Sequence, residues 1–240
     1  MSISDNIASV QDEIASACSR VGRNTDTVKL VAVSKTHPPE MILEAIDAGL
    51  TDFGENRVEE SQKKVPQVNE QVANAPTWHF IGHIQSRKAA DVTALFDVVH
   101  SVDRIKIARY LSDKGQEQDR HLSALIEINI SGEDAKYGFN GYNWQIDQRV
   151  RDALWQNIRT MLDLPHLDIR GLMTMAPFYD KMETTRPIFA GLAELRDELQ
   201  SSLGIALPEL SMGMTNDYPV AIEEGATMIR VGRAIFGERQ

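Results

Sequence analysis

The sequence is short of cysteine, of long apolar runs and of positive charge, and each shortage excludes a class of protein. Cys18 is the only cysteine, so the chain forms no intramolecular disulfide and no cluster of thiolate metal ligands. No apolar run approaches the roughly 18 residues that a membrane-spanning helix needs. The formal net charge of −10 argues against a nucleic-acid or anionic-membrane binder, because both need clustered positive charge. Since the first residues also lack a signal-peptide pattern, we expect a cytoplasmic protein.

What the chain does contain is a regular alternation of short apolar runs and helical patterns. The runs predict eight strands, at residues 29–35, 51–56, 78–83, 98–102, 122–130, 169–177, 208–214 and 227–236. Eight strand-and-helix units in about 240 residues are typical of a (β/α)8 TIM barrel of the α/β class. An open doubly wound sheet is the alternative, but it does not need eight regular units. No linker rich in glycine, serine or proline divides the chain, so we predict one domain over residues 1–240.

An additional helix is predicted before the first strand. Apolar residues spaced by three or four positions form one stripe along it, at Ile3, Ile7, Val10, Ile14, Ala17 and Val21, and Cys18 is expected to pack there. The segments between strands predict a helix from Arg57 to about Val65, a polar loop over 66–76, and a helix capped by Asp103. Residues 131–141 are expected to form a loop, followed by a helix over 143–161.

Lys35 interrupts an apolar strand just before a turn. Side chains alternate along a strand, so Val31, Val33 and Lys35 share one face. If this face lines a barrel interior, Lys35 lies at the mouth and must reach water or a partner. Partial burial or nearby positive charge lowers the pKa of such an amine and makes it a nucleophile for Schiff-base formation. The alternative is an ordinary lysine at a strand end that extends into solvent.

In a TIM barrel, functional groups follow the carboxyl ends of the strands. Ser211 and Gly213 belong to the seventh strand end, and Gly232 belongs to the eighth. Loops after these two strands commonly bind phosphate through backbone N–H groups and a hydroxyl. Plain turns are the alternative explanation of these residues. The pairing of the two strand ends favours a phosphate site.

Arg230 shares a strand face with Gly232, so we expect it inside the barrel mouth, where it needs an acceptor. A salt bridge to Glu55 is one possibility. A pyridine nitrogen is another, and it stays unprotonated there because arginine does not give up its proton. His79 and His83 share a strand face, but few carboxylates are near, so packing or ligand contact is favoured over a metal pair. A lysine, a phosphate site and an arginine on one rim indicate pyridoxal 5′-phosphate (PLP).

Six segments make the indication specific: VAVSKTHP, FGENRVEE, WHFIGHIQSRK, EDAKYG, GLMTMAP and LSMGMTNDYPVAIEEGATMIRVGRAIFG. In this order, from about residue 28 to residue 237, they resemble the YggS/PROSC family of PLP-binding homeostasis proteins. The resemblance implies a fold-type III barrel like the N-terminal domain of alanine racemase, without a second domain.

The resemblance also implies roles for individual residues. Lys35 would carry PLP as a Schiff base, and Arg230 would face the pyridine nitrogen. The remaining cofactor contacts expected at the strand ends are Asn56, His79, Met173, Ser211, Met212, Gly232 and Arg233, with Ser211 and the backbone of Gly232 and Arg233 at the phosphate. Many relatives have threonine or serine at the position of Arg233. Lys136 matches a lysine that assists cofactor handling, or else is a solvated loop lysine.

Members of this family are regarded as PLP buffers or carriers rather than enzymes. The resemblance therefore implies a role in vitamin B6 homeostasis, without robust catalysis, with PLP and PLP-dependent apo-enzymes as partners, and as a monomer or weak dimer. A PLP-dependent amino-acid racemase is the main alternative. Two-base racemisation needs a second acid or base opposite the lysine, for which Tyr137 and Tyr142 are candidates without fixed geometry. A Schiff-base aldolase that uses Lys35 without cofactor is the third possibility.

Overall fold

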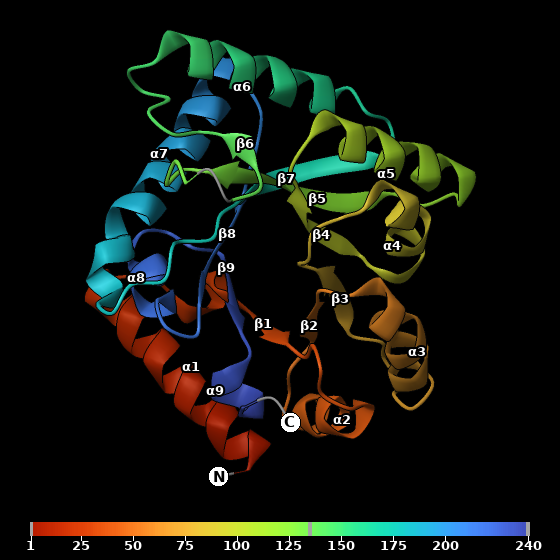
Figure 1. Cartoon of the computed structure of the whole chain (residues 1–240). Coiled ribbons are helices and arrows are strands. Elements are labelled where there is room, and N and C mark those ends of the chain that lie inside the picture. The colour runs from red at the N-terminus through yellow and green to blue at the C-terminus, as the bar shows by residue number, and fades with distance from the viewer. Residues whose placement is uncertain (1, 134–135, 239–240) are drawn as a thin grey trace.

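The chain forms a closed barrel of parallel strands surrounded by helices, as Figure 1 shows. The computed structural model describes residues 2–133 and 136–238. The strands run in the order β4-β3-β2-β1-β9-β8-β7-β5, and pairing of β4 with β5 closes the barrel. Their bounds are β1 (Lys29–Val33), β2 (Asp52–Glu55), β3 (Thr77–Phe80), β4 (Val98–Val102), β5 (Leu122–Asn129), β7 (Leu167–Met173), β8 (Glu209–Met214) and β9 (Met228–Val231). The predicted eight-stranded TIM barrel is confirmed.

Helices cover the outside of the barrel between successive strands (Figure 1). They are α2 (Pro39–Asp47), α3 (Val58–Asn69), α4 (Ala89–Leu95), α5 (Ile105–Glu117), α6 (Gln148–Leu162), α7 (Arg186–Leu203), α8 (Tyr218–Glu223) and α9 (Arg233–Phe236), with short 3-10 turns at Thr25–Thr27, Ser86–Lys88 and Met182–Thr185. The main core lies between these helices and the outer faces of the strands. A smaller cluster of Leu125, Met173 and Met228 fills part of the barrel interior.

The helix that precedes the barrel is α1 (Ile3–Arg20). Ser2 caps it with a reciprocal bond to Asp5, which satisfies backbone N–H groups that the first turn leaves without partners. Its apolar stripe from Ile3 to Ala17 and Cys18 are buried, and the helix packs against α2, α8 and α9. Val21, predicted as the last residue of the stripe, follows the helix and is exposed. Each large apolar side chain that is fully buried contributes about 1.5–3 kcal/mol. The helix is therefore an integral part of the fold, as its sequence pattern predicts.

Several predicted boundaries are wrong, for local reasons. Helix α3 continues through Pro66 to Asn69 because Val65 and Val68 extend its buried stripe. Asp103 does not cap helix α5, because its carboxylate is bound by His83 and Arg104; Arg104 takes the N-cap position without a side-chain cap bond. The predicted helix over 143–161 starts only at Gln148, after Asp147 accepts bonds from its first turn.

Three further differences lie at the carboxyl ends of strands. Within residues 131–141, predicted as a loop, the chain forms strand β6 (Phe139–Asn140), which pairs with the end of β5. The last strand ends at Val231 rather than at residue 236, because the backbone turns at Gly232 into α9. Similarly, β1 ends at Val33, so Lys35 lies in the turn after the strand. These turns shape the mouth of the barrel.

Candidate functional site

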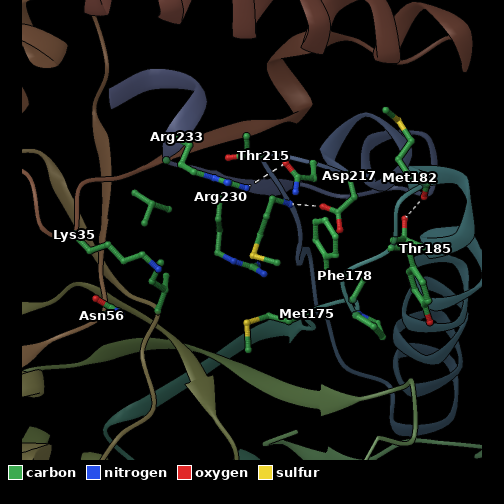
Figure 2. Close-up of a pocket in the computed structure, with 18 of the residues that line it drawn as sticks. Lys35, Asn56, Met175, Phe178, Met182, Thr185, Thr215, Asp217, Arg230 and Arg233 are labelled. Atoms are coloured by element: carbon green, nitrogen blue, oxygen red, sulfur yellow. Dashed lines mark hydrogen bonds between the residues drawn. The ribbon is translucent and has the colours of Figure 1, made fainter. Parts of the chain in front are cut away.

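A cavity of about 650 Å³ opens at the carboxyl ends of the strands. Its walls come from the turns after β1, β2 and β3, the loop after β7, the loop after β8, and the junction of β9 with α9. Figure 2 shows that Lys35 enters from one wall while the guanidinium of Arg230 extends into the centre. The cavity thus lies where a TIM barrel ordinarily carries its function.

Five of the nine predicted cofactor contacts line this cavity: Lys35, Asn56, Arg230, Gly232 and Arg233. The other four do not belong to its lining among the described residues. His79 and Ser211 are fully buried in the barrel interior and hydrogen-bonded there. Met173 packs against Leu125 and Met228, and Met212 belongs to the outer core.

The turn that carries Lys35 is held by a buried group of charged residues behind it. The Nζ of Lys64 donates to the carbonyl of Ser34 and to Glu55, each at 3.0 Å, and also pairs with Glu60. The hydroxyl of Ser34 donates to Glu55 at 2.7 Å. The backbone N–H of Thr36 donates to Glu60 at 2.7 Å. Both neighbours of Lys35 in the chain are therefore fixed through their own hydrogen bonds.

Burial also acts on the carboxyl group of Glu55. The pKa of Glu55 is raised by burial, an effect that Lys64 and Ser34 oppose. One of its oxygens, Oε2, is buried without a partner among the described residues.

Thr36 adopts a left-handed backbone with φ of 66°, which is unusual for a β-branched residue. The turn is thus over-determined by its contacts rather than by its intrinsic preference.

Arg230 is 4% exposed and projects from β9 toward the cavity (Figure 2). It donates to the hydroxyl of Ser211 at 2.5 Å and to the carbonyl of Thr174 at 3.0 Å. Glu55 pairs with Lys64, and no salt bridge between Arg230 and Glu55 occurs in the described structure. Burial lowers the pKa of Arg230 to about 10, with Asp217 and Glu127 opposing the change. Because 10 is still far above neutrality, the guanidinium remains a cation.

Asn56 presents a buried oxygen without a protein partner. Its Oδ1 has none among the described residues, and Asn56 lines the cavity. Gly82 packs directly on the backbone of Asn56, where a Cβ at position 82 would lie 2.2 Å from its carbonyl oxygen. A glycine at position 82 is therefore needed to keep Asn56 in place. A buried polar atom without a partner normally indicates a missing ligand or water.

The loop after β8 supplies a hydroxyl that the sequence analysis missed. Thr215, Asn216 and Asp217 of this loop line the cavity, together with Met214 at the end of β8. The carboxylate of Asp217 accepts from the N–H of Met214 at 2.6 Å and closes the loop into a tight turn. Gly213 precedes it with φ of 89°. This turn brings Thr215 to the cavity four residues after Ser211, which lies inside the barrel.

Arg233 adds positive charge at the same end of the cavity. Its side chain is 54% exposed, with Glu238 at 3.9 Å, and it donates to Asn216 at 3.4 Å (Figure 2). It therefore faces the cavity mouth rather than turning away from it. Together with the hydroxyl of Thr215 and the backbone at Gly232, it forms a site suited to an anion.

A further part of the cavity mouth is formed by partly exposed apolar and aromatic side chains. Met175, Phe178, Tyr179 and Met182 line the cavity and are at least one-third exposed. Lys136 lies beside them, bonded to the carbonyl of Met175 and paired with Glu133. Of the candidate second bases, neither Tyr137 nor Tyr142 belongs to the cavity lining in the described structure.

The ring of Tyr137 instead stacks on His83, whose Nδ1 lies 3.0 Å from Asp103. Among the described residues, no group of three or more histidine, cysteine or acidic side chains is arranged to hold a metal ion. None of the helices described is long and apolar enough to cross a membrane.

Comparison with known proteins identifies the family of this chain. Residues 7–240 match the family model described as alanine racemase, N-terminal domain. The pyridoxal phosphate homeostasis protein of Aquifex aeolicus is 39% identical over 240 residues, covering all of both chains. That of Haemophilus influenzae is 41% identical and is covered to 97%. The chain belongs to the pyridoxal phosphate homeostasis protein family.

Two solved structures are similar in fold to this protein. PipY of Synechococcus elongatus, whose structure has been determined with PLP bound, superposes with a TM-score of 0.82 at 33% identity; the match covers 98% of this chain and 100% of that one. Alanine racemase of Clostridium difficile superposes with a TM-score of 0.73 at 14% identity, and the match covers 60% of that chain. At that identity the likeness concerns the barrel fold alone.

Proposed function

We propose that this protein binds PLP in the cavity at the barrel mouth and serves PLP homeostasis. The observation that carries the proposal is that one cavity is lined by Lys35, Arg230 and Thr215, contributed by different strand ends. These groups match an aldehyde, a ring nitrogen and a phosphate respectively. The membership of the homeostasis family supports the same function, and PipY, with PLP bound, is a structural relative.

The residues present fit this cofactor. When bound, PLP supplies an aldehyde that condenses with a primary amine. Lys35 is the lysine in the cavity lining among the described residues, so we assign it the covalent attachment. The unpartnered Oδ1 of Asn56 supplies an acceptor for a hydroxyl group. Thr215, Gly232 and Arg233 hold the phosphate.

The position of Arg230 favours a protein that holds PLP over an enzyme that uses it for catalysis. A guanidinium has donors and no acceptor, so it binds an unprotonated ring nitrogen and supplies it with no proton. An unprotonated pyridine withdraws electrons weakly, which disfavours carbanion chemistry. We therefore assign the protein a holding and delivering role, with PLP-dependent apo-enzymes as recipients, in place of amino-acid turnover.

The deciding experiment is an absorbance spectrum of the purified protein with and without added PLP, followed by borohydride reduction and peptide mass analysis. We expect a visible band that reduction fixes at Lys35. Lys35→Arg keeps the charge but cannot form the bond, so it should lose the fixed adduct; Lys136→Ala should retain it. A protein that gains no band with PLP, or is labelled equally in Lys35→Arg, contradicts the proposal.

The racemase alternative is tested on the same preparations. Two-base racemisation requires a second acid or base opposite Lys35, and neither Tyr137 nor Tyr142 lines the described cavity. We expect no conversion of L-alanine to D-alanine beyond that of free PLP. Racemisation that depends on Lys35 would instead favour an enzyme.

A further inference from the structure

A continuous chain of hydrogen bonds runs through the barrel interior to Arg230. The Nε2 of His79 lies 2.9 Å from Oδ1 of Asp52, and its Nδ1 lies 2.8 Å from Nε2 of His100. The Nδ1 of His100 lies 2.8 Å from Oγ of Ser211, which in turn accepts from Arg230. His79, His100 and Ser211 are each fully buried. The proposed contacts with the cofactor do not explain why these polar side chains are buried and linked in this way.

The chemistry of the groups fixes the direction of every bond. Arg230 can only donate, so Ser211 accepts from it. The hydroxyl of Ser211 has a second lone pair, so the direction of its own hydrogen is set from the opposite end, where the ionised Asp52 can only accept. With both imidazole rings neutral, Nδ1 of His100 is unprotonated and accepts from Ser211. His100 consequently carries its proton on Nε2 and donates it to Nδ1 of His79. His79 donates from Nε2 to Asp52.

The charges along the chain agree with this direction. Burial holds the pKa of His100 well below its ordinary value, and the positive charge of Arg230 lowers it further, so His100 is neutral. Burial raises the pKa of Asp52, but hydrogen bonds from His79 and Thr51 outweigh it and leave the pKa lowered. Asp52 is also paired with Lys29 at 3.3 Å, at the start of the strands. The chain therefore ends on an ionised carboxylate at the far end of the barrel.

Arg230 needs this support because the barrel provides it with no direct ion pair. Among the residues described, no carboxylate lies within 4.0 Å of its guanidinium. A buried cation without a partner is costly, and a directed chain of hydrogen bonds polarises its terminal acceptor. Ser211, backed by two histidines and Asp52, is the side-chain acceptor that Arg230 has.

We propose that Ser211, His100 and His79 are positioning residues, which fix the guanidinium of Arg230 toward the ring of the cofactor from beneath the cavity floor. The inference rests on the proposed PLP function. It assigns Ser211 an indirect role through Arg230, in place of a direct contact with phosphate. Asp52 anchors the chain at the opposite end of the barrel.

The first test needs no cofactor and so is independent of the proposed function. Nitrogen-15 NMR of histidine-labelled protein reads which ring nitrogen carries the proton, and His79→Gln and His100→Gln variants assign the signals. We expect both rings neutral and protonated on Nε2 from about pH 6 to about pH 8, the range in which histidine ordinarily titrates. A proton on Nδ1 of His100 would overturn the directed chain.

The second test compares two ligands in Ser211→Ala. If Ser211 acts through Arg230 on the ring, binding of PLP and of pyridoxal, which lacks the phosphate, should weaken alike, by roughly tenfold for a lost hydrogen bond to a charged group. The absorbance band of the bound cofactor should also shift. A loss confined to PLP would mean a direct phosphate contact and would refute the inference, as would unchanged binding of both ligands.

Leu125→Ala is the control for a general weakening of the barrel interior. Leu125 packs beside Met173 and Met228 and takes no part in the chain. We expect it to lower the unfolding temperature at least as much as Ser211→Ala while leaving both affinities and the band position unchanged. If it reproduces the spectral and binding changes of Ser211→Ala, the effect is structural and the positioning role is wrong. If the wild-type protein binds neither ligand, the proposed function fails.

Discussion

The two walls of the cavity hold their functional side chains in different ways. On the wall formed after β1 and β2, Lys64, Glu55 and Glu60 contact the backbone and the side chain of Ser34 and the backbone of Thr36, so they fix the turn around Lys35. On the wall formed by β8 and β9, contacts converge on the side chain of Arg230 itself. Charged groups hold the first wall, and neutral groups hold the second.

The difference matches what each side chain has to do. An amine that forms and releases a covalent bond needs freedom beyond its Cα, so fixing only the backbone is sufficient. A guanidinium that serves as a fixed donor gains from having its end group immobilised, because preorganised donors lose less entropy on binding. The comparison predicts that damage to the first wall changes stability most, and damage to the second changes ligand binding most.

The largest effect is expected from Lys64→Met. Lys64 is 5% exposed, and its removal leaves two carboxyl groups near one another without a cation. Breaking a buried ion pair on one side costs about 3–5 kcal/mol, so we expect a loss of about 3 kcal/mol in the free energy of unfolding, measured by urea denaturation.

The matched control is Lys64→Met combined with Glu55→Leu. Replacing both members of a buried pair by apolar residues is often close to neutral, so the double variant should recover most of the lost stability. If the double variant is as unstable as the single one, the ion pair is not what holds the turn around Lys35.

The second prediction concerns the pH dependence of the Arg230 wall. Burial, reinforced by Asp103, raises the pKa of Glu127 to about 7, while Arg230 opposes the change. In the unfolded chain this carboxyl has the ordinary glutamate pKa of 4.5. Between these values only the folded state holds the proton, so stability falls as pH rises, by about 1.4 kcal/mol per pH unit. Glu127→Gln should remove this slope between about pH 5 and pH 7.

Urea denaturation of both proteins at several pH values measures the difference. Glu127→Gln keeps a polar side chain of the same size, so the two proteins should have similar stability near pH 5 and diverge as pH rises. Parallel curves over this range would show that Glu127 is ionised at neutral pH, and the Arg230 wall would then carry a buried negative charge.

Much of this fold could be read from the sequence, because its signals are local and repeated. Eight apolar runs with helical patterns between them specify a barrel, and the stripe of α1 is unbroken. Boundaries failed where tertiary contacts override local preference. Pro66 predicts a helix end, but the burial of Val65 and Val68 carries the helix past it. The single-domain organisation and the cytoplasmic location stay predictions.

The site was predictable only where one residue acts alone. Lys35 and Arg230 could be identified as site residues from the sequence, because a charged residue at the end of an apolar strand needs a partner. Ser211 could not be placed, since whether a hydroxyl faces a ligand or a histidine depends on side chains more than 100 positions away. No sequence pattern identified Thr215, because the loop conformation that places it at the cavity depends on a hydrogen bond from the N–H of Met214 to Asp217.

A smaller effect is expected from Arg233→Thr, which replaces the guanidinium by a hydroxyl. Arg233 is half exposed at the cavity mouth, and exposed charges contribute about 0.2–1 kcal/mol. PLP binding should therefore become about threefold weaker, with no change for pyridoxal. Arg233→Lys, which keeps the charge, is the control. Unchanged PLP dissociation in Arg233→Thr would show that the charge does not reach the phosphate.

An effect of similar size, on stability rather than on binding, is expected from Thr36→Gly. A left-handed conformation costs an L-residue about 1–2 kcal/mol, and glycine removes this cost but loses about 0.5–1 kcal/mol more backbone entropy on folding. The variant should therefore be about 0.5–1 kcal/mol more stable in urea denaturation. Thr36→Ala removes the branch but keeps the Cβ, so it should gain less. The N–H bond to Glu60 survives in both variants, so PLP binding through Lys35 should be unchanged. If Thr36→Gly instead weakens PLP binding, the turn holds Lys35 through the threonine side chain as well as through its backbone, and the contrast between the two walls would be smaller than the hydrogen bonds indicate.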